Sequence, residues 1–305
     1  MDLEPLLLGG SPHLTRGEVA ERAGVSLEVA EELWRLLGFA RTTAEDVAFT
    51  DADVDALRQA RELMELGILG TDSQAALVRT WGRSYARLAE WQASLLVDLS
   101  PDDDVAAAAL PRVESLQSYA WRRHLASAVA RVDASATSGP ETRMAVCFVD
   151  IVGYTSRSKS LDEAELVSWL ECFEDAATGL VVDHGGRIIK TIGDEVLFVA
   201  DRAVDAAEAA LLMTERGADE DDDFPAVRAG LAYGDVVSRL GDVFGPTVNI
   251  ASRLTSVARP GSVLVDDGGH EELAEEAAYT FRRMRRTPVK GYSRLQPRVL
   301  RRAER

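Results

Sequence analysis

Apolar and polar positions follow two different patterns along the chain, and the change falls near residue 140. Before it, apolar residues recur at three- and four-residue spacing, which predicts helices. Those expected to form a helical bundle core between residues 52 and 99 are Leu57, Met64, Leu77, Trp81, Leu88, Trp91 and Leu95. After residue 142, short apolar runs alternate with helical stretches, which predicts a sheet with helices on one face. The small, polar segment 133–142 between the two patterns suits a linker.

The start of the chain predicts two short helices joined by a turn. Thr15 followed by Glu18 is a capping-box pattern, and Ser26 is placed to cap the next helix. This stretch resembles a winged, MerR-like helix-turn-helix. However, residues 1–139 contain 13 Arg, no Lys and 22 acidic residues. Since phosphate contacts supply most non-specific affinity for DNA, we expect a packing or regulatory role and no nucleic-acid partner.

A further helix is predicted over residues 112–132, after the break "SPDDD" at 100–104. It leads directly into the linker and could transmit a signal. We therefore expect three parts: a helical regulatory domain over 1–110, a linker helix with a flexible linker over 111–139, and a catalytic domain over 140–305.

The second half of the chain predicts the element order β-α-β-β-α-β. Strands are expected over 143–152, over the hairpin 188–199 and over 226–240, with helices over 161–186 and 201–217. A helix over 247–258 and a strand over 262–267 follow. The acidic run 218–224 between the second helix and its next strand reads as a solvated loop.

Composition narrows the class of protein. The net charge is −17, with 34 Lys and Arg against 51 Asp and Glu, so a phosphate ligand needs a local positive site. Cys147 and Cys172 lie in apolar stretches without a metal-binding spacing, which predicts reduced core cysteines. No basic leader and no apolar run of about 20 residues is visible, so we expect a soluble, cytoplasmic protein without a membrane partner.

Two aspartates follow strand-like runs beside glycine turns. Asp150 ends the run in "FVDIVGYT", and Asp194 follows Gly193 in "IIKTIGDEVLFV". Carboxylates on adjacent strands can share a pair of Mg²⁺ ions, with the substrate phosphates as further ligands. Taken singly, each aspartate is more often a cap or a turn residue.

Two further segments carry polar residues suited to phosphoryl chemistry. In "GDVFGPTVNIASRL", Asn249 and Arg253 are four residues apart and therefore share one helical face. An arginine there can stabilise the charge of a transferring phosphoryl group. In "PVKGY", Lys290 precedes a glycine, as a phosphate-contacting lysine does.

Together, in this order and at this spacing, the four motifs resemble those of the class III nucleotidyl cyclases, over roughly 143–300. The resemblance implies an α+β catalytic domain of ferredoxin-like, palm type with a βαββαβ core. The region before it resembles the all-α regulatory domain of soluble actinobacterial adenylate cyclases.

The resemblance also assigns site residues. It implies metal binding by Asp150, Asp194 and the Ile151 carbonyl, and adenine recognition by Lys190 and Asp242. Because guanylate cyclases of the family typically carry Glu and Cys at the last two positions, Lys and Asp imply ATP as substrate.

For the remaining chemistry, the resemblance implies transition-state roles for Asn249 and Arg253 and a triphosphate contact for Lys290. The turn formed by Gly153, Tyr154 and Thr155 is expected to bind substrate phosphate through its N–H groups. Two divalent ions, Mg²⁺ or Mn²⁺, are the implied cofactors. The implied reaction gives 3′,5′-cyclic AMP and pyrophosphate at the interface of a head-to-tail homodimer.

Regulation and two rival functions stay open from the sequence. His13 and His124 lie in the N-terminal part, and histidine titrates near neutral pH, so control of activity by pH is a hypothesis. A diguanylate cyclase also places acids on a hairpin tip, but the second glycine of its signature is absent here. A DNA-binding regulator with a degenerate, nucleotide-sensing cyclase domain is the non-enzymatic alternative.

Overall fold

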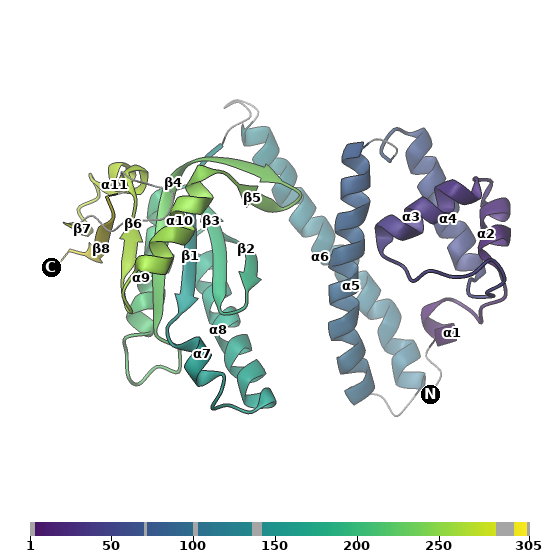
Figure 1. Cartoon of the computed structure of the whole chain (residues 1–305), viewed down its shortest axis with the longest axis horizontal. Helices are drawn as coiled ribbons and strands as arrows, with labels where there is room; N and C mark the ends of the chain where they lie inside the picture. Colours follow the sequence, from purple (N-terminus) through teal and green to yellow (C-terminus); the bar gives the residue numbers. More distant parts are fainter. Residues whose placement is uncertain (1–3, 70–71, 100–102, 136–141, 285–295, 304–305) are drawn as a thin grey trace. The chain divides into compact units, whose positions relative to one another are not determined.

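The computed structural model describes residues 4–69, 72–99, 103–135, 142–284 and 296–303. The chain divides into two compact units, residues 1–129 and 130–305 (Figure 1). The division point falls inside the long helix α6 (Asp103–Ser135). The expected three-part organisation stays a prediction.

The first unit is helical, as the spacing of apolar residues predicts. Its helices before α6 are α1 (Glu4–Leu7), α2 (Arg16–Ala23), α3 (Leu27–Leu37), α4 (Asp51–Glu65) and α5 (Asp72–Leu99). The expected capping box is confirmed: Thr15 Oγ1 accepts from the Glu18 N–H at 3.4 Å, and the Glu18 carboxylate accepts from the Thr15 N–H at 2.8 Å. Ser26 caps α3 by accepting from the Val29 N–H at 3.3 Å.

Two expectations for this unit are wrong. Trp91, expected in the bundle core, is 60 % exposed, whereas Leu57 is 1 % exposed. The helix expected from residue 112 begins at Asp103 and contains Pro111 in its interior. The helix therefore starts inside the acidic segment that was expected to be a break.

The second unit is built around one mixed sheet. Among the described residues this sheet has eight strands. Seven of them lie side by side in the order β2-β3-β1-β4-β6-β8-β7, and β5 pairs with β4. The strands are β1 (Thr142–Ile151), β2 (Arg187–Ile192), β3 (Glu195–Ala200), β4 (Val227–Arg239), β5 (Asp242–Phe244), β6 (Val263–Val265), β7 (Tyr279–Arg283) and β8 (Arg298–Arg302). The helices are α7 (Tyr154–Arg157), α8 (Glu163–Asp183), α9 (Ala203–Arg216), α10 (Pro246–Val257) and α11 (Asp267–Leu273). The order β4-β1-β3-β2 at the centre is that of a ferredoxin-like βαββαβ core.

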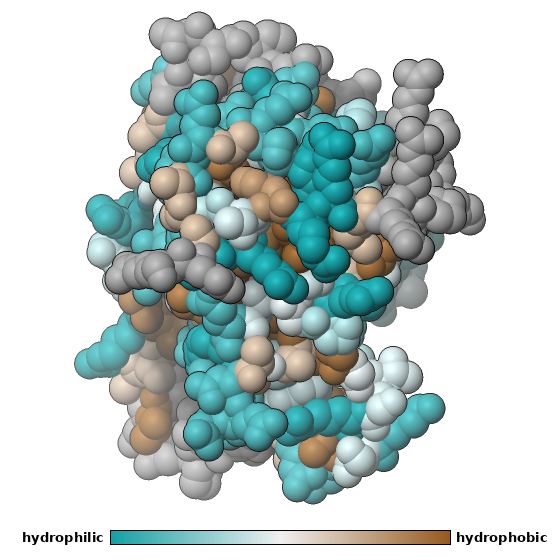
Figure 2. Space-filling model, turned by 90° about the vertical axis from the view of Figure 1, so that its left-hand side faces the viewer, coloured by the Kyte–Doolittle hydropathy of each residue, from teal (hydrophilic) through white to brown (hydrophobic). Residues whose placement is uncertain are grey.

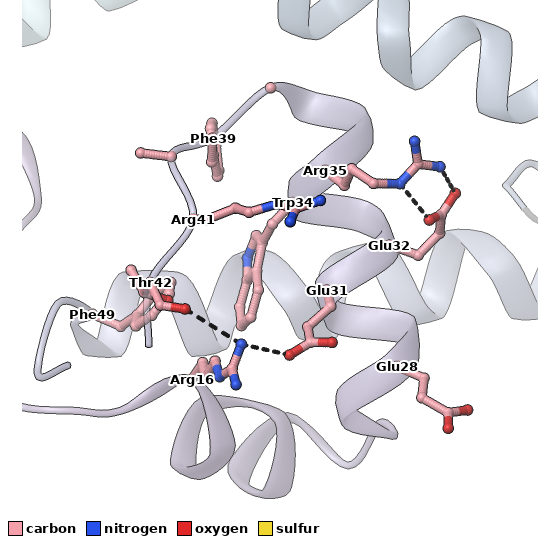
Figure 3. A pocket seen from close by; sticks show the side chains of 12 residues that line it. Arg16, Glu28, Glu31, Glu32, Trp34, Arg35, Phe39, Arg41, Thr42 and Phe49 are labelled. Atoms are coloured by element: carbon pink, nitrogen blue, oxygen red, sulfur yellow. Dashed lines mark hydrogen bonds and ion pairs between the residues drawn. The ribbon is translucent and has the colours of Figure 1, made fainter. Parts of the chain in front are cut away.

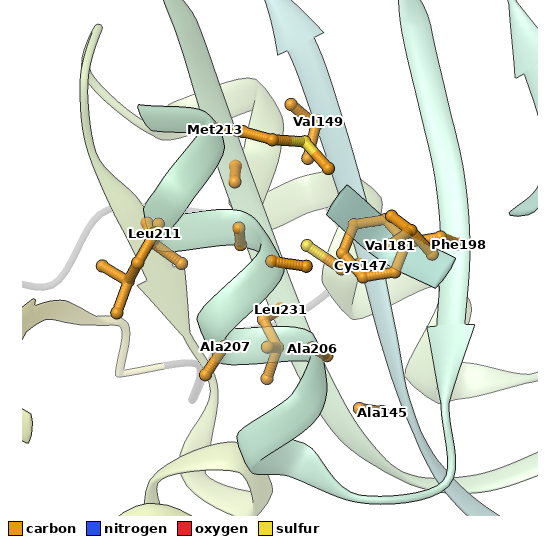
Figure 4. Close-up of a cluster of buried hydrophobic side chains, with 14 of the residues drawn as sticks. Ala145, Cys147, Val149, Val181, Phe198, Ala206, Ala207, Leu211, Met213 and Leu231 are labelled. Atoms are coloured by element: carbon orange, nitrogen blue, oxygen red, sulfur yellow. The ribbon is translucent and has the colours of Figure 1, made fainter. Parts of the chain in front are cut away.

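Helices cover both faces of this sheet, which corrects the expectation of one covered face. The larger core packs one face against α8 and α9 and includes Cys147, Val181 and Phe198 (Figure 4). Met144, Val146 and Phe148, which alternate with the first set along β1, face the other way and cluster with Ala251 of α10. The βαββαβ pattern predicts the α8 and α9 layer but contains no information on α10.

Helix α10 lies unusually close to β4. A Cβ atom added to Gly230 would lie 2.3 Å from the Thr255 N atom and 2.5 Å from the Ala251 carbonyl oxygen. The Thr255 hydroxyl also donates to the Phe148 carbonyl oxygen on β1 at 3.2 Å. The absence of a side chain at Gly230 therefore sets the position of α10 over the sheet.

The acidic loop after α9 is only partly the solvated loop expected. Asp222 accepts from Arg216 Nε at 2.7 Å and Nη2 at 2.9 Å, and from the Phe224 N–H at 2.8 Å. The Arg216 guanidinium and the Phe224 N–H lower the pKa of Asp222 to about 2. Arg216 lies over the Phe224 ring, which is buried against Phe173, so one charged residue ties this loop to the core.

The surface of the molecule is mainly polar on the face seen in Figure 2, where apolar residues form separate small areas. Of the two cysteines, Cys147 is buried as expected, but Cys172 on α8 is exposed, so its predicted core position is wrong. No helix of the described ranges has the length and apolar content needed to cross a bilayer.

Candidate active site

Acidic side chains gather where β1 ends beside the β2–β3 turn. Asp150 lies next to the end of β1 and pairs directly with Glu195, the first residue of β3. Asp194 precedes Glu195 in the turn, after Gly193 with a φ of 65°, and its carbonyl oxygen accepts from the Ile151 N–H at 3.2 Å. The structure thus brings Asp150, Ile151 and Asp194 together, as the hairpin pattern predicts.

Arg228 of β4, a cation that none of the sequence motifs includes, lies at this point. It lies directly opposite Asp150 in the strand pairing. Its Nε and Nη2 atoms both contact Asp150 Oδ2, at 2.7 Å and 2.5 Å. Nothing in the segment "FPAVRAG" singles this arginine out, and only the register of β1 against β4 reveals its partner.

The acidic cluster has more negative charge than Arg228 balances. Burial, together with the Asp150 carboxylate, raises the pKa of Asp194. Burial and the carboxylates of Asp150 and Asp194 raise the pKa of Glu195 to about 7. A site in which neighbouring carboxylates resist ionisation favours a bound cation.

The turn after β1 presents free backbone donors. Gly153 has a φ of 75°, in the left-handed region, and precedes the four-residue helix α7. Within residues 142–284, the N–H groups of Gly153, Tyr154 and Thr155 have no hydrogen-bond acceptor. They are consequently available to a ligand, as expected for a phosphate-binding turn.

Lys190 and Asp242 are in direct contact although 52 residues separate them. Lys190 Nζ lies 2.5 Å from Asp242 Oδ2, and the other Asp242 oxygen accepts from the Val243 N–H at 2.8 Å. Lys190 shares the face of the sheet covered by α10, because it pairs with Leu197, which clusters with Ala251. The two residues that the resemblance paired are therefore neighbours, and both remain partly open to solvent.

Asn249 and Arg253 occupy the exposed side of α10, whereas Ala251 and Leu254 on the same helix are buried. Their predicted placement on one accessible helical face is confirmed. Lys290 lies outside the described residues, so its predicted role stays a prediction.

The helix-turn-helix region of the first unit encloses a separate pocket of about 530 Å³ (Figure 3). Two of the three glutamates on α3 are used in ion pairs at its wall: Glu31 contacts Arg16 at 2.8 Å, and Glu32 contacts Arg35 at 2.5 Å. Arg16 also donates to the Thr42 carbonyl oxygen at 3.3 Å. Two cations of this pocket, Arg16 and Arg35, are thus paired with acidic residues of the same unit. This arrangement is poorly suited to binding DNA phosphates.

Most of the chain is similar to known proteins. Residues 137–301 match the family model described as the adenylate and guanylate cyclase catalytic domain. An adenylate cyclase of Streptomyces coelicolor is 42 % identical over 89 % of this chain and 74 % of its own length. An adenylate cyclase of Glutamicibacter nicotianae is 36 % identical over 97 % of this chain and 80 % of its own length.

A protein of Mycobacterium tuberculosis described as a pH-sensitive adenylate cyclase is 31 % identical over 86 % of this chain and 70 % of its own length. The matches to these relatives extend well into the helical N-terminal unit, and the family model covers the unit that carries the acidic cluster. The chain therefore belongs to the class III adenylate and guanylate cyclase family.

Proposed function

We propose that this chain is an adenylate cyclase that converts ATP into 3′,5′-cyclic AMP and pyrophosphate. The observation that carries the choice of ATP is the contact between Lys190 and Asp242. A lysine ammonium can donate to a ring nitrogen of adenine, while an aspartate can accept from the exocyclic amine. Guanine presents a carbonyl and a ring N–H at these positions and would be poorly matched. The names of the relatives are consistent with this choice.

Divalent ions fit the acidic cluster. Its donors are carboxylate oxygens, the ligands preferred by Mg²⁺. Burial, and after it the neighbouring carboxylates, raise the pKa of Asp194 and of Glu195, so a bound cation would favour their ionised forms. In the described part of the chain, no three acidic, histidine or cysteine side chains form a complete metal cage. Asp150, Asp194 and the Ile151 carbonyl would hold two Mg²⁺ or Mn²⁺ ions, and substrate phosphates would complete their coordination. When bound, such ions lower the pKa of an attacking hydroxyl and stabilise a pyrophosphate leaving group.

The residues of α10 act on the reacting phosphate. The 3′-hydroxyl of ATP attacks the α-phosphorus, the P–O bond to the β-phosphate breaks, and negative charge develops on the equatorial oxygens. Arg253 stabilises that charge, and Asn249 holds the ribose and phosphate in line. Gly153, Tyr154 and Thr155 bind phosphate oxygens through their N–H groups.

The working unit is a homodimer with the two catalytic units head to tail. Each site combines the acidic cluster of one copy with Lys190, Asp242, Asn249 and Arg253 of the other. Large apolar side chains near Lys190 and Asp242 support an interface there: Ile192 is 49 % exposed, and Val237 and Phe244, which pair across β4 and β5, are each 50 % exposed. A group of exposed apolar side chains on the surface of the second unit favours contact with another protein surface.

A complementation experiment tests the proposal. Asp150→Ala and Arg253→Ala proteins are each expected to make almost no cyclic AMP, because each homodimer lacks one half of both sites. After unfolding and refolding an equal mixture, half of the dimers are mixed and each contains one intact site. Activity should return to about one quarter of that of the wild type.

Absence of any recovery in a mixture shown to exchange subunits would contradict the shared site. Near-normal cyclisation by Asp150→Ala alone would contradict the metal role. Identification of the products from ATP and from GTP, with Mg²⁺ and with Mn²⁺, separates this function from a diguanylate cyclase and from a catalytically inert nucleotide sensor.

We further propose that the N-terminal unit controls activity and that pH is one input. His13 Nε2 lies 3.6 Å from Asp51 Oδ2, so protonation of this histidine would create an ion pair. His124 on α6 is exposed. Activity between pH 5 and 8 should differ in profile between the full chain and residues 140–305. Identical profiles would remove the pH role and leave the catalytic proposal intact.

A further inference from the structure

One aromatic side chain of α8 supports both ends of the short helix α7. The Trp169 ring stacks with the Tyr154 ring at a centroid separation of 6.2 Å and an interplanar angle of 10°. The guanidinium of Arg157, the last residue of α7, lies 4.6 Å from the centroid of the same indole. The phosphate-binding turn is therefore braced against α8 by Trp169.

The positive charge of Arg157 is not neutralised by this contact. Its side chain is exposed, and within the described ranges no carboxylate forms an ion pair with it. Arg216 and Arg228 of the same unit, by contrast, each contact an aspartate directly. An aromatic face orients a guanidinium while leaving its N–H groups free for another acceptor.

Arg157 is close to the turn along the backbone. Its N–H donates to the Gly153 carbonyl oxygen at 3.1 Å, so it lies one helical turn, about 5 Å, beyond Gly153. The free N–H groups of residues 153–155 thus belong to the same short segment as an uncompensated guanidinium. Backbone donors and a fork of N–H groups are both suited to phosphate oxygens.

We propose that Arg157 is a further substrate-binding residue, which contacts the triphosphate bound at the turn, and that Trp169 is the positioning residue which holds its guanidinium. This inference rests on the proposed function, because it identifies an additional phosphate contact of that site. No motif of the sequence analysis includes either residue.

The indole N–H of Trp169 takes no part in these contacts. Nε1 is buried and has no hydrogen-bond partner in the described part of the chain. Trp169 therefore contributes through the faces of its ring and not through its N–H. Phenylalanine should preserve both contacts to a large extent, whereas leucine, of comparable hydrophobicity, should lose them.

The test compares paired variants in the full-length protein. We expect Arg157→Met to raise the KM for ATP about tenfold and to change kcat less than about twofold, because a charged phosphate contact is lost from binding. Arg157→Lys should recover a part of the affinity. Trp169→Leu should raise KM about threefold to fivefold, and Trp169→Phe less than about twofold.

Lys159 provides the matched control. It is an exposed cation two residues beyond Arg157, and among the described residues the cation over the Trp169 ring is Arg157 and not Lys159. Lys159→Met removes the same charge from the same loop and should leave KM within about twofold of the wild type. An equal rise of KM in both methionine variants would reduce the effect to non-specific attraction and overturn the proposal.

Equilibrium binding of a non-hydrolysable ATP analogue, followed by intrinsic tryptophan fluorescence or calorimetry, gives a readout that does not need turnover. Weaker binding by Arg157→Met than by Lys159→Met supports the proposal even in a preparation without cyclase activity. Equal binding overturns it. Failure of the wild type to produce any cyclic nucleotide refutes the proposed function instead, so the two failures are distinguishable.

Discussion

Replacement of Gly230 by alanine tests how the sheet positions α10. The added Cβ would lie 2.3 Å from the Thr255 N atom and 2.5 Å from the Ala251 carbonyl oxygen, both backbone atoms. Ordinary contacts begin near 3.4 Å, so α10 must move away from β4 by about 1 Å. Overpacking of this kind costs about 1–3 kcal/mol of unfolding free energy. Because α10 carries Asn249 and Arg253, a shift of this size should also reduce turnover by about 10².

The assay combines urea unfolding with measurement of cyclic AMP production by the folded protein. Gly179→Ala is the control. This glycine lies in a middle turn of α8, is exposed to solvent, and has no atom within 4 Å of an added Cβ. It should stabilise the protein by about 0.5–1 kcal/mol and leave turnover unchanged. Wild-type stability and turnover in Gly230→Ala would refute the close approach of α10 to β4.

Three further predictions concern charged residues. Asp222→Asn should lower the melting temperature at pH 6, because the ion pair with Arg216 depresses the pKa of Asp222 to about 2. This stabilisation is present above the ordinary carboxyl pKa and is lost as pH falls from about 4 towards 2. A difference in melting temperature between variant and wild type that is as large at pH 2 as at pH 6 would contradict it. Lys190→Met should lower kcat/KM for ATP by about 10–100-fold and kcat/KM for GTP much less. The melting temperature should change little, since the ion pair of Lys190 with Asp242 is partly exposed. An unchanged ratio of ATP to GTP turnover would remove the role of Lys190 in base selection. Arg253→Ala should lower kcat by about 10²–10³ with a smaller effect on KM, and single-turnover cyclisation at the wild-type rate would exclude a transition-state role.

Local patterns carried most of the information on the catalytic core. The apolar residues on both sides of a short polar centre at Gly193 predicted the hairpin of β2 and β3, and the register places Asp150 opposite Glu195. The contact of Lys190 with Asp242 was expected only through the family resemblance, since no rule of spacing joins residues so far apart. Arg228 was missed for the same reason: its partner is set by strand pairing and not by neighbours in the sequence.

Elements at the margins of the core were harder to predict. Helix α10 has an amphipathic pattern, but that pattern does not say which face of the sheet the helix covers. Its close approach to β4 also requires a residue without a side chain at Gly230, far away in the sequence. Strands β7 and β8 and helix α11 follow the last strand expected from the sequence, over 262–267, and no pattern predicted them. The interior position of Pro111 in α6 shows that a residue with a strong preference for the first helical turn does not always mark the start of a helix.

The hairpin of β2 and β3 has a consequence for communication between active sites. Lys190 lies on its first strand and Asp194 in its turn, four residues further on. In the proposed homodimer, the lysine serves one site and the aspartate the other, so a single short lever belongs to both. A movement of this hairpin when adenine binds at one active site would alter cation coordination at the other active site. Nucleotide saturation curves should therefore deviate from simple hyperbolas.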